Sequence, residues 1–560
     1  MDKKPVVLEI DLGLGVQSTD PKDPVSAVRS RNIPRLNAIV AGLRHGAEDD
    51  DVVAAVVHIA PQATVWQVEE LGLALRAFRD SGKKVIAWTE SFGELGPDTV
   101  GYYLATAADE IWLQPSGSVG LQGVSLSVTT VRGVLDKIGA EPQIGQRHEY
   151  KSAAEMYTST EISEPNREMT SRMCESVTGQ VITATATGRR LEPAQVVDAI
   201  GAAPLTAQQA TERGLVDRLG YRADVYRAVR DEFGQVVDGD EPELRLIYAH
   251  RYARSITKEA LRRTWLGRAR HRPIIAVVGV QGGIVTGRGS RQVPFGQPQA
   301  ASDHVIAALR AAAENDAVRA VVLRVESPGG SYIASDAIRD AVLRVKGTGR
   351  PVIASMGSLA ASGGYFVSMA ADKIIALPST LTGSIGVLGG KVVIKDTLNK
   401  IGITYEALGD RPATMFSPTR VFEHDEWAKI ESWLDAVYDD FTHKAAADRG
   451  LAYETLEGVA RGRVWTGSDA RERGLVDELG GFQHAIKEAC RRVGVDIDHV
   501  RVQGFPQLSM LARLRPAESS ESPAAALIKA RPRGVLESVS QALGVETGGI
   551  LTMPWRFDFR

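Results

Sequence analysis

The sequence predicts an α/β protein in which one domain occurs twice in tandem. Two pairs of segments support the duplication: Gly101–Gly120 matches Gly364–Gly386, and Thr206–Gly220 matches Thr466–Gly480. The paired segments occur in the same order and are offset by 263 residues (364 − 101) and 260 residues (474 − 214). Self-similarity at one nearly fixed offset is the signature of an internal repeat. Chance is a poor explanation for two such matches.

Each half shows the same alternation of buried strands and helices. A helix is expected at Asn32–Gly46 and at Ser302–Glu314, and a buried strand follows at Val52–Ile59 and at Val318–Val325. The next expected element is a helix, at Trp66–Ser81 and at Ser335–Gly347. A strand, a short turn and another helix follow, and a further strand is expected at Glu110–Leu113 and at Lys373–Leu377. Strands that alternate with helices indicate right-handed βαβ units and a parallel sheet.

One stretch of the second half is built to be buried, because no charged residue occurs from Pro351 to Ala371. The many Gly and Ser residues divide it into short units, which excludes a transmembrane helix. We expect a strand at Pro351–Met356, a turn of small residues at Gly357–Ala361 and a helix at Ser362–Ala371. Ser362 then lies at a strand-to-helix turn, where free backbone N–H groups suit a nucleophile. Gly363 and Gly364 follow it and let a substrate backbone approach closely.

A nucleophilic Ser requires a base. The chain has ten His residues, and none shares a motif with Ser362. A Lys can act as the base when burial lowers its pKa to roughly 7–8. The question is therefore which Lys could reach Ser362.

The two halves differ where chemistry is expected. After its buried strand, the second half has the loop Glu326–Ser331 with a glycine pair, whereas the first half has Ile59–Ala63 without one. The first half has Thr99 where the second has Ser362, but it carries Lys151 where the second half has no Lys. Thr99 lacks the following glycine pair, so we do not expect it to be a second nucleophile. One half is expected to supply the nucleophile and the other the base, which makes a single composite site.

Composition narrows the function classes. A chain of 560 residues with 44% apolar and 24% charged residues is typical of a soluble protein with two to four domains. The net charge of −3 gives no argument for nucleic-acid binding. Cys174 and Cys490 match no metal spacing and predict no disulfide framework. Neither a signal peptide nor a transmembrane helix is expected, so we predict a cytoplasmic protein, peripheral at most to the inner face of the cell membrane.

Four regions are expected. Residues 1–240 form the first repeat, residues 241–272 an Arg-rich linking helix, residues 273–495 the second repeat, and residues 496–560 a linker and tail. In the tail, Pro516–Pro523 reads as a flexible linker and Ala524–Leu543 as an amphipathic helix. We expect the tail to dock onto the body or a neighbouring subunit, with membrane-surface contact as the alternative.

Four motifs in order carry a family resemblance: EYKSA (149–153), ESPGGS (326–331), SLAASGGYF (358–366) and PSTLTGSIGV (378–387). They resemble the signal peptide peptidase A family of Ser–Lys peptidases in its long, two-domain form, over roughly Asn32 to Phe482. Relatives commonly have Asn where this chain has Glu326. We expect Glu326 to be a solvated or capping residue. The resemblance implies a fold similar to the caseinolytic protease and crotonase group.

By position, the resemblance implies that Ser362 is the nucleophile, Lys151 the general base and Ser384 the residue that orients the Lys. It also implies an oxyanion hole formed by the N–H groups of Gly363 and the Gly329–Gly330 loop. The expected substrates are signal peptides or other unfolded apolar peptides, without a cofactor or metal, in a homo-oligomer that is tetrameric by the resemblance. A crotonase-like acyl-CoA enzyme and a non-catalytic membrane-associated scaffold are the alternatives.

Overall fold

The structure, a computed structural model, describes residues 4–17, 32–61, 63–94, 96–236, 242–264, 272–289, 298–506 and 551–552. Two compact units divide the chain. Unit 1 contains Met1–Leu126 and Cys174–Arg270, and unit 2 contains Ser127–Met173 and His271–Phe557. The units therefore do not follow the linear boundary expected at residue 240, because a segment of the first half, Ser127–Met173, belongs to unit 2.

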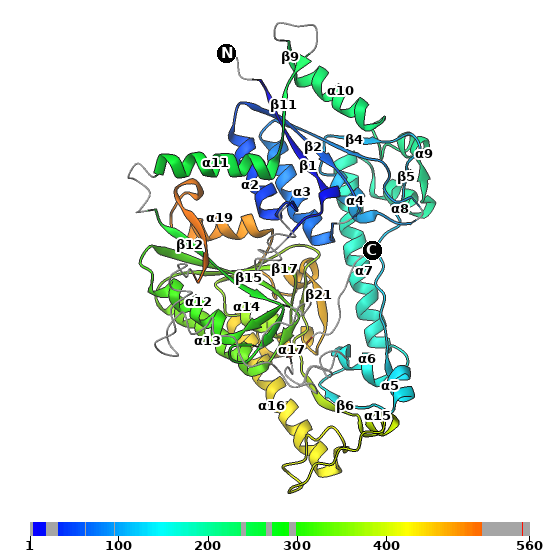
Figure 1. Ribbon diagram of the computed structural model, residues 1–560, viewed down its shortest axis with the longest axis vertical. Coiled ribbons are helices and arrows are strands. Elements are labelled where there is room, and N and C mark those ends of the chain that lie inside the picture. The colour runs from blue at the N-terminus through cyan, green and yellow to red at the C-terminus, as the bar shows by residue number, and fades with distance from the viewer. Residues whose placement is uncertain are drawn as a thin grey trace. The chain divides into compact units, whose positions relative to one another are not determined.

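A parallel sheet forms the centre of unit 1 (Figure 1). Its strand order is β11-β1-β2-β3-β4-β8, and every neighbouring pair is parallel. The bounds of these strands are Arg245–Tyr248 (β11), Val6–Asp11 (β1), Val52–His58 (β2), Lys84–Thr89 (β3), Glu110–Leu113 (β4) and Arg218–Leu219 (β8). The accompanying helices are Leu36–Glu48 (α2), Val65–Asp80 (α3), Thr99–Ala105 (α4), Pro193–Ala202 (α8), Ala207–Glu212 (α9), Arg222–Phe233 (α10) and Ala249–Thr264 (α11).

Unit 2 repeats this topology. Its parallel strands follow the order β23-β12-β15-β17-β18-β22, and β19 and β21 extend the sheet from β17. The strands are Arg501–Phe505 (β23), Ile274–Gln281 (β12), Val318–Ser327 (β15), Val352–Ala361 (β17), Lys373–Ala376 (β18), Glu478–Leu479 (β22), Leu381–Gly383 (β19) and Val464–Thr466 (β21). The helices are Ser302–Glu314 (α12), Tyr332–Gly347 (α13), Gly363–Ser368 (α14), His424–Arg449 (α16), Tyr453–Val459 (α17), Gly467–Glu472 (α18) and Phe482–Arg492 (α19). The matching strand orders confirm the duplication expected from the sequence.

Alternate residues of the central strands enter two separate cores, as the period of two in a strand requires. In unit 1, Leu8 and Val57 face the core with α2 and α3, whereas Val7 and Val56 face α10. In unit 2, the equivalent division places β12, β15 and β17 residues against α12 to α14 on one face and against α19 on the other. Because both faces are covered, the strands read as continuous apolar runs in the sequence.

The structure corrects one expected element. The turn expected at Gly357–Ala361 is instead the second half of β17, which continues to Ala361. The first half of β17 pairs with β18, and the second half pairs with β19 (Leu359↔Leu381 to Ala361↔Gly383). Pairing with β19 supplies the hydrogen bonds that keep these small residues extended, a tertiary contact that a single sequence does not reveal. The following helix α14 is shorter than expected and ends at Ser368.

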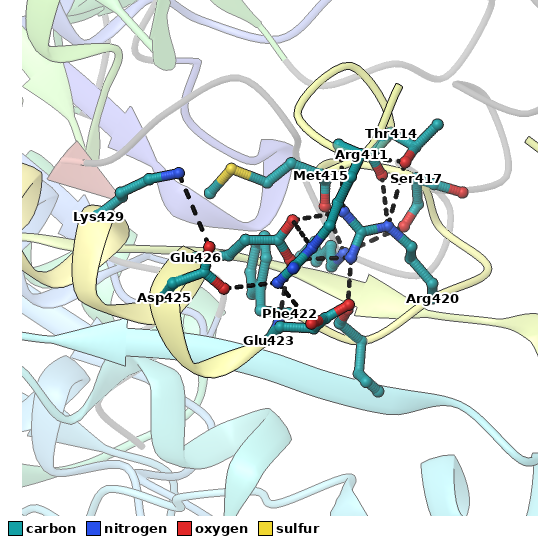
Figure 2. Close-up of polar contacts among 12 residues, drawn as sticks. Arg411, Thr414, Met415, Ser417, Arg420, Phe422, Glu423, Asp425, Glu426 and Lys429 are labelled. Atoms are coloured by element: carbon teal, nitrogen blue, oxygen red, sulfur yellow. Dashed lines mark hydrogen bonds and ion pairs between the residues drawn. The ribbon is translucent and has the colours of Figure 1, made fainter. Parts of the chain in front are cut away.

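An antiparallel ribbon in unit 2 joins β6 (Glu141–Gln146) to β20 (Leu388–Val393). The loop before α16 is held against this ribbon, since Phe422 N–H donates to Gln143 Oε1 (2.6 Å) and Lys391 Nζ donates to the Met415 carbonyl (2.6 Å). An ion pair connects this loop to the first turn of α16 (Figure 2). Arg420 binds the Glu426 carboxylate in a bidentate manner, with Nη1 2.8 Å from Oε2. This hydrogen-bonded guanidinium holds the pKa of Glu426 well below its usual range.

Other elements of unit 2 are shorter. They are Arg132–Ile138 (α5), Glu155–Thr158 (α6), Gly283–Val285 (β13), Gln299–Ala301 (β14), Gly329–Gly330 (β16), Lys395–Lys400 (α15) and Leu551–Thr552 (β24), while Glu164–Arg189 (α7) continues into unit 1. In the described part of the chain, no helix combines the length and apolar character needed to cross a membrane. The expected linker at Pro516–Pro523 and helix at Ala524–Leu543 lie outside the described residues.

The packing of α2 against α11 predicts a sharp response at one glycine. A Cβ on Gly42 would lie 2.1 Å from the Ala249 carbonyl oxygen, so the helix backbones touch at this point. Gly42→Ala is expected to lower the free energy of unfolding by about 1–3 kcal/mol, measured by denaturant titration. Gly72→Ala on α3 is the control, because its Cβ would meet only the flexible end of Arg76 at 3.4 Å. Equal stabilities of the two variants would contradict the close packing.

Candidate active site

The β6–β20 ribbon brings Lys151 to the second repeat within unit 2. Arg147 N–H donates to the Val387 carbonyl (3.0 Å) where the ribbon ends, and Lys151 follows four residues later at the start of a 3₁₀ turn. On the other strand, β20 is preceded by β19 and Ser384. The ribbon therefore sets the position of Lys151 relative to Ser384 although 233 residues separate them in the chain.

Three expected residues meet at one point. Lys151 Nζ lies 2.9 Å from Ser362 Oγ, 2.9 Å from Ser384 Oγ and 2.9 Å from the Ser384 carbonyl oxygen. Lys151 and Ser384 are 1% and 2% exposed, and Ser362 is fully buried. All three residues belong to unit 2. The arrangement joins a hydroxyl to an amine through a direct hydrogen bond.

Burial controls the charge of this amine. Desolvation lowers the pKa of Lys151 from 10.5 to about 7, since the low-dielectric surroundings disfavour an ammonium. The two nearby carboxylates are engaged elsewhere. Glu149 is paired with Arg461 (3.0 Å), and Glu155 accepts hydrogen bonds from Ser163 N–H (3.1 Å) and Asn166 Nδ2 (2.9 Å). Neither carboxylate stabilises the charged form of Lys151.

Two glycines form the wall beside Lys151. A Cβ on Gly462 would lie 2.5 Å from the backbone N of Lys151, and its φ of +81° is a conformation that other residues rarely adopt. A Cβ on Gly386 would lie 3.2 Å from Lys151 Cδ. Neither contact was predicted from the sequence, because an isolated glycine in a loop carries no pattern that identifies its neighbour.

Backbone strain concentrates around this point. Among the described residues, five non-glycine residues have positive φ: His148 (62°), Arg190 (56°), Ser362 (56°), Ser384 (51°) and Arg461 (50°). Four of them, all except Arg190, lie at or beside the Lys151 contacts. Such conformations cost roughly 1–3 kcal/mol each and persist only where the surroundings hold them. Ser362 is held by its N–H bond to the Gly383 carbonyl (2.8 Å) and by the Phe366 N–H bond to its own carbonyl (2.9 Å).

The glycine loop lies directly beside Ser362. A Cβ on Gly363 would lie 3.1 Å from Gly330 N and 3.1 Å from Gly329 Cα, so the loop and the start of α14 are in close contact. The Gly329 N–H donates to Ser327 Oγ (3.1 Å), and Ser327 Oγ donates to the Gly282 carbonyl (2.7 Å). The expected oxyanion-hole residues Gly363, Gly329 and Gly330 are thus adjacent to Ser362.

The equivalent position in unit 1 has a different environment. Thr99 Oγ1 donates to the Gly123 carbonyl (2.8 Å), so its hydroxyl is a structural contact of α4. Across the described part of both units, no group of three or more His, Cys, Asp or Glu side chains is arranged to hold a metal ion.

Comparisons with known proteins identify the family. Residues 77–235 and 344–496 match the family model described as Peptidase family S49, and residues 290–382 match the Clp protease model. The chain belongs to peptidase family S49. This confirms the resemblance drawn from the four motifs, and the Clp protease match agrees with the parallel sheet of unit 2.

Three curated relatives align with most of the chain. Protease 4 of Salmonella typhi is 32% identical over 462 residues, which cover 81% of this chain and 71% of that protein. The chloroplastic serine protease SPPA of Arabidopsis thaliana is 30% identical over 459 residues, covering 81% of this chain and 65% of that one. Protease 4 of Haemophilus influenzae is 30% identical over 504 residues, covering 86% and 77%. The chain is thus a peptidase of the serine type found in this family.

Solved structures give a weaker similarity. A ClpP1 mutant from Listeria monocytogenes superposes with a TM-score of 0.25 at 14% identity and covers 38% of this chain and 94% of its own.

The close contact between Gly462 and the Lys151 backbone leads to a prediction. Gly462→Ala is expected to displace the Lys151 backbone and to lower the peptidase kcat by about 100-fold, because a misplacement of about 1 Å has that effect on catalysis. Peptide turnover measured alongside the melting temperature tests this. Gly458→Ala is the control, since a Cβ there meets nothing within 4 Å. Full activity of the folded Gly462→Ala protein would contradict the importance of this contact.

Proposed function

We propose that the protein is a serine endopeptidase in which Ser362 is the nucleophile and Lys151 the general base. The observation that carries the proposal is the 2.9 Å contact between a buried Lys amine and a buried Ser hydroxyl. Ser362 Oγ attacks the peptide carbonyl as Lys151 Nζ accepts its proton. Lys151 then protonates the leaving amine, and water hydrolyses the acyl-enzyme.

The contacts of Lys151 can be made by a neutral amine. A neutral Lys has two N–H donors and one lone pair, whereas an ammonium has three donors. The Ser384 carbonyl can only accept, and Ser384 Oγ can accept the second N–H. The lone pair then remains for the proton of Ser362. Ser384 in this way directs the base toward the nucleophile.

Backbone N–H groups supply the oxyanion hole. The Gly363 N–H follows the nucleophile directly, and Gly330 is its neighbour in the glycine loop. Because Gly329 N–H is already donated to Ser327 Oγ and Gly330 is paired with Leu551 of β24, Gly363 is the strongest candidate. Each such donor is worth about 3 kcal/mol of transition-state stabilisation.

An extended peptide is the substrate that fits this site. The Gly329–Gly330 strand β16 pairs with β13 on one side and antiparallel with the extended segment β24 (Leu551–Thr552) on the other, so a peptide substrate that pairs here would have to take the place of β24. Main-chain pairing at a strand edge gives affinity that is independent of sequence. We propose unfolded, apolar-rich segments as substrates, with signal peptides as the class that the family resemblance implies.

Removal of either reacting group is expected to abolish turnover. Ser362→Ala should lower kcat at least 1,000-fold. The loss of kcat in Lys151→Met should lie within about tenfold of that value, since residues that act as one catalytic unit have non-additive effects. Cleavage of an unfolded apolar-rich peptide, read by mass spectrometry, measures both. Lys391→Met is the control, because that Lys supports only the ribbon loop. Cleavage by Ser362→Ala would overturn the proposal. The alternatives would then be an acyl-CoA enzyme or a scaffold, with the cleavage due to a contaminating peptidase.

The rate should depend on pH in one direction. Only neutral Lys151 accepts a proton, and its pKa is about 7. The value of kcat/KM is therefore expected to be low at pH 5–6, to rise through about pH 7 and to level off above pH 8. A rise centred near pH 10 would show that the base is a solvated Lys.

Stability should respond to the same group. In the unfolded chain Lys151 has its ordinary pKa of 10.5, so between pH 7 and 10.5 the unfolded state binds one more proton than the folded state. The stability of the wild type should therefore increase with pH across this window, by up to about 1.4 kcal/mol per pH unit, relative to Lys151→Met. Paired denaturant titrations at pH 7 and 9.5 measure the difference. Parallel pH dependences in the two proteins would show that Lys151 is charged in the folded state.

A further inference from the structure

The strand that ends at Ser362 is irregular beside the glycine loop. In the pairing of β15 with β17, Val325 is opposite Met356 but Ser327 is opposite Ala360. One residue of β15, Glu326, therefore faces the three residues 357–359 of β17, which contains two extra residues at this point. Such a widening leaves backbone N–H groups without their ladder partners.

The Glu326 side chain replaces those partners. Its Oε2 accepts the Ser358 N–H (2.8 Å), its Oε1 accepts the Ser358 hydroxyl, and the Leu359 N–H also donates to the carboxylate. On the other side of the widening, Thr380 Oγ1 donates to the Gly357 carbonyl (2.7 Å). A Cβ on Gly357 would lie 1.7 Å from Oε2, so glycine is required for the carboxylate to reach the strand. Glu326 is partly buried and is held by the backbone of β17, so it is not the freely solvated or helix-capping residue that was expected.

The widening marks the place where β17 changes its neighbour. Before it, β17 pairs with β18, and after it, β17 pairs with β19. Residues 359–361 then lead directly to Ser362, and β19 leads directly to Ser384. Glu326 itself is followed by Ser327 and the Gly329–Gly330 loop. Three parts of the proposed site begin within a few residues of this carboxylate.

We propose that Glu326 is a positioning residue whose carboxylate fixes the widened part of β17 and thereby the placement of Ser362 against the Gly329–Gly330 loop. This inference rests on the proposed function. Glu326 does not touch the reacting atoms, and acts through the backbone of residues 358 and 359.

A purely stabilising role explains the carboxylate less well. Burial raises the pKa of Glu326, with the Ser358 contacts and Arg324 opposing the effect, so placing an anion here has a desolvation cost. A regular pairing of β15 with β17, without the two extra residues, would need no carboxylate here and would avoid this desolvation cost. The cost is consistent with a requirement for this particular strand geometry at the site.

Steady-state kinetics on the full chain test the proposal. Glu326→Ala is expected to lower kcat by about 10- to 100-fold with KM changed less than about threefold, because loss of alignment affects the transition state more than binding. Glu326→Gln keeps one acceptor oxygen and should recover most of the loss. Gly357→Ala expels the carboxylate and should match Glu326→Ala, and the double variant should lose no more than either single variant.

Asp372→Ala is the matched control. Asp372 Oδ2 accepts the Val352 N–H (2.8 Å) at the far end of the same strand, so its loss should lower the melting temperature without changing kcat by more than about twofold. A kcat within twofold of wild type for folded Glu326→Ala, or additive losses in the Glu326–Gly357 cycle, would overturn the inference. Cleavage that persists in Ser362→Ala would instead overturn the proposed function, so the two failures are distinguishable.

Discussion

The hydrogen bond between Lys151 Nζ and Ser362 Oγ requires a Lys to remain inside a dry interior, and much of unit 2 serves that requirement. Desolvation of a buried ammonium is costly, so burial without a carboxylate partner favours the neutral amine, and the surrounding hydroxyl and carbonyl oxygens accept its N–H groups. Glu149 forms an ion pair with Arg461 and so does not pair with Lys151. The glycine at 462 lets the Lys backbone approach where any side chain would block it.

Duplication explains how such a site could be assembled from one fold. Both units contain the same order of parallel strands, with a late helix, α10 or α19, covering the second face. The second repeat has the glycine loop and the proposed nucleophile, whereas the first has contributed Ser127–Met173, with Lys151, to the same compact unit. In unit 1 the position equivalent to Ser362 is Thr99, whose hydroxyl donates a hydrogen bond to the Gly123 carbonyl.

The sequence was informative where a pattern is local or repeated. The offset segments predicted the duplication, and Ser362, Lys151 and Ser384 were predicted from motifs that the structure brings within hydrogen-bonding distance. It was wrong about residues 357–361, because the extended form of residues 359–361 depends on pairing with β19, 22 residues further along the chain (381 − 359). The contacts of Glu326 were also missed, since its partners belong to the backbone and a hydroxyl of another strand. Contacts of this kind leave no residue-type signature, and only the fold reveals them.

The central claim is that Lys151 activates Ser362. The most direct measurement is the rate at which a fluorophosphonate labels the protein between pH 5 and 10, with the modified residue identified by mass spectrometry. Labelling of Ser362 alone is expected, with a rate that rises through about pH 7 in the wild type. The rise should be abolished in Lys151→Met. Labelling at another residue, or equally fast labelling of Ser362 in Lys151→Met, would contradict it.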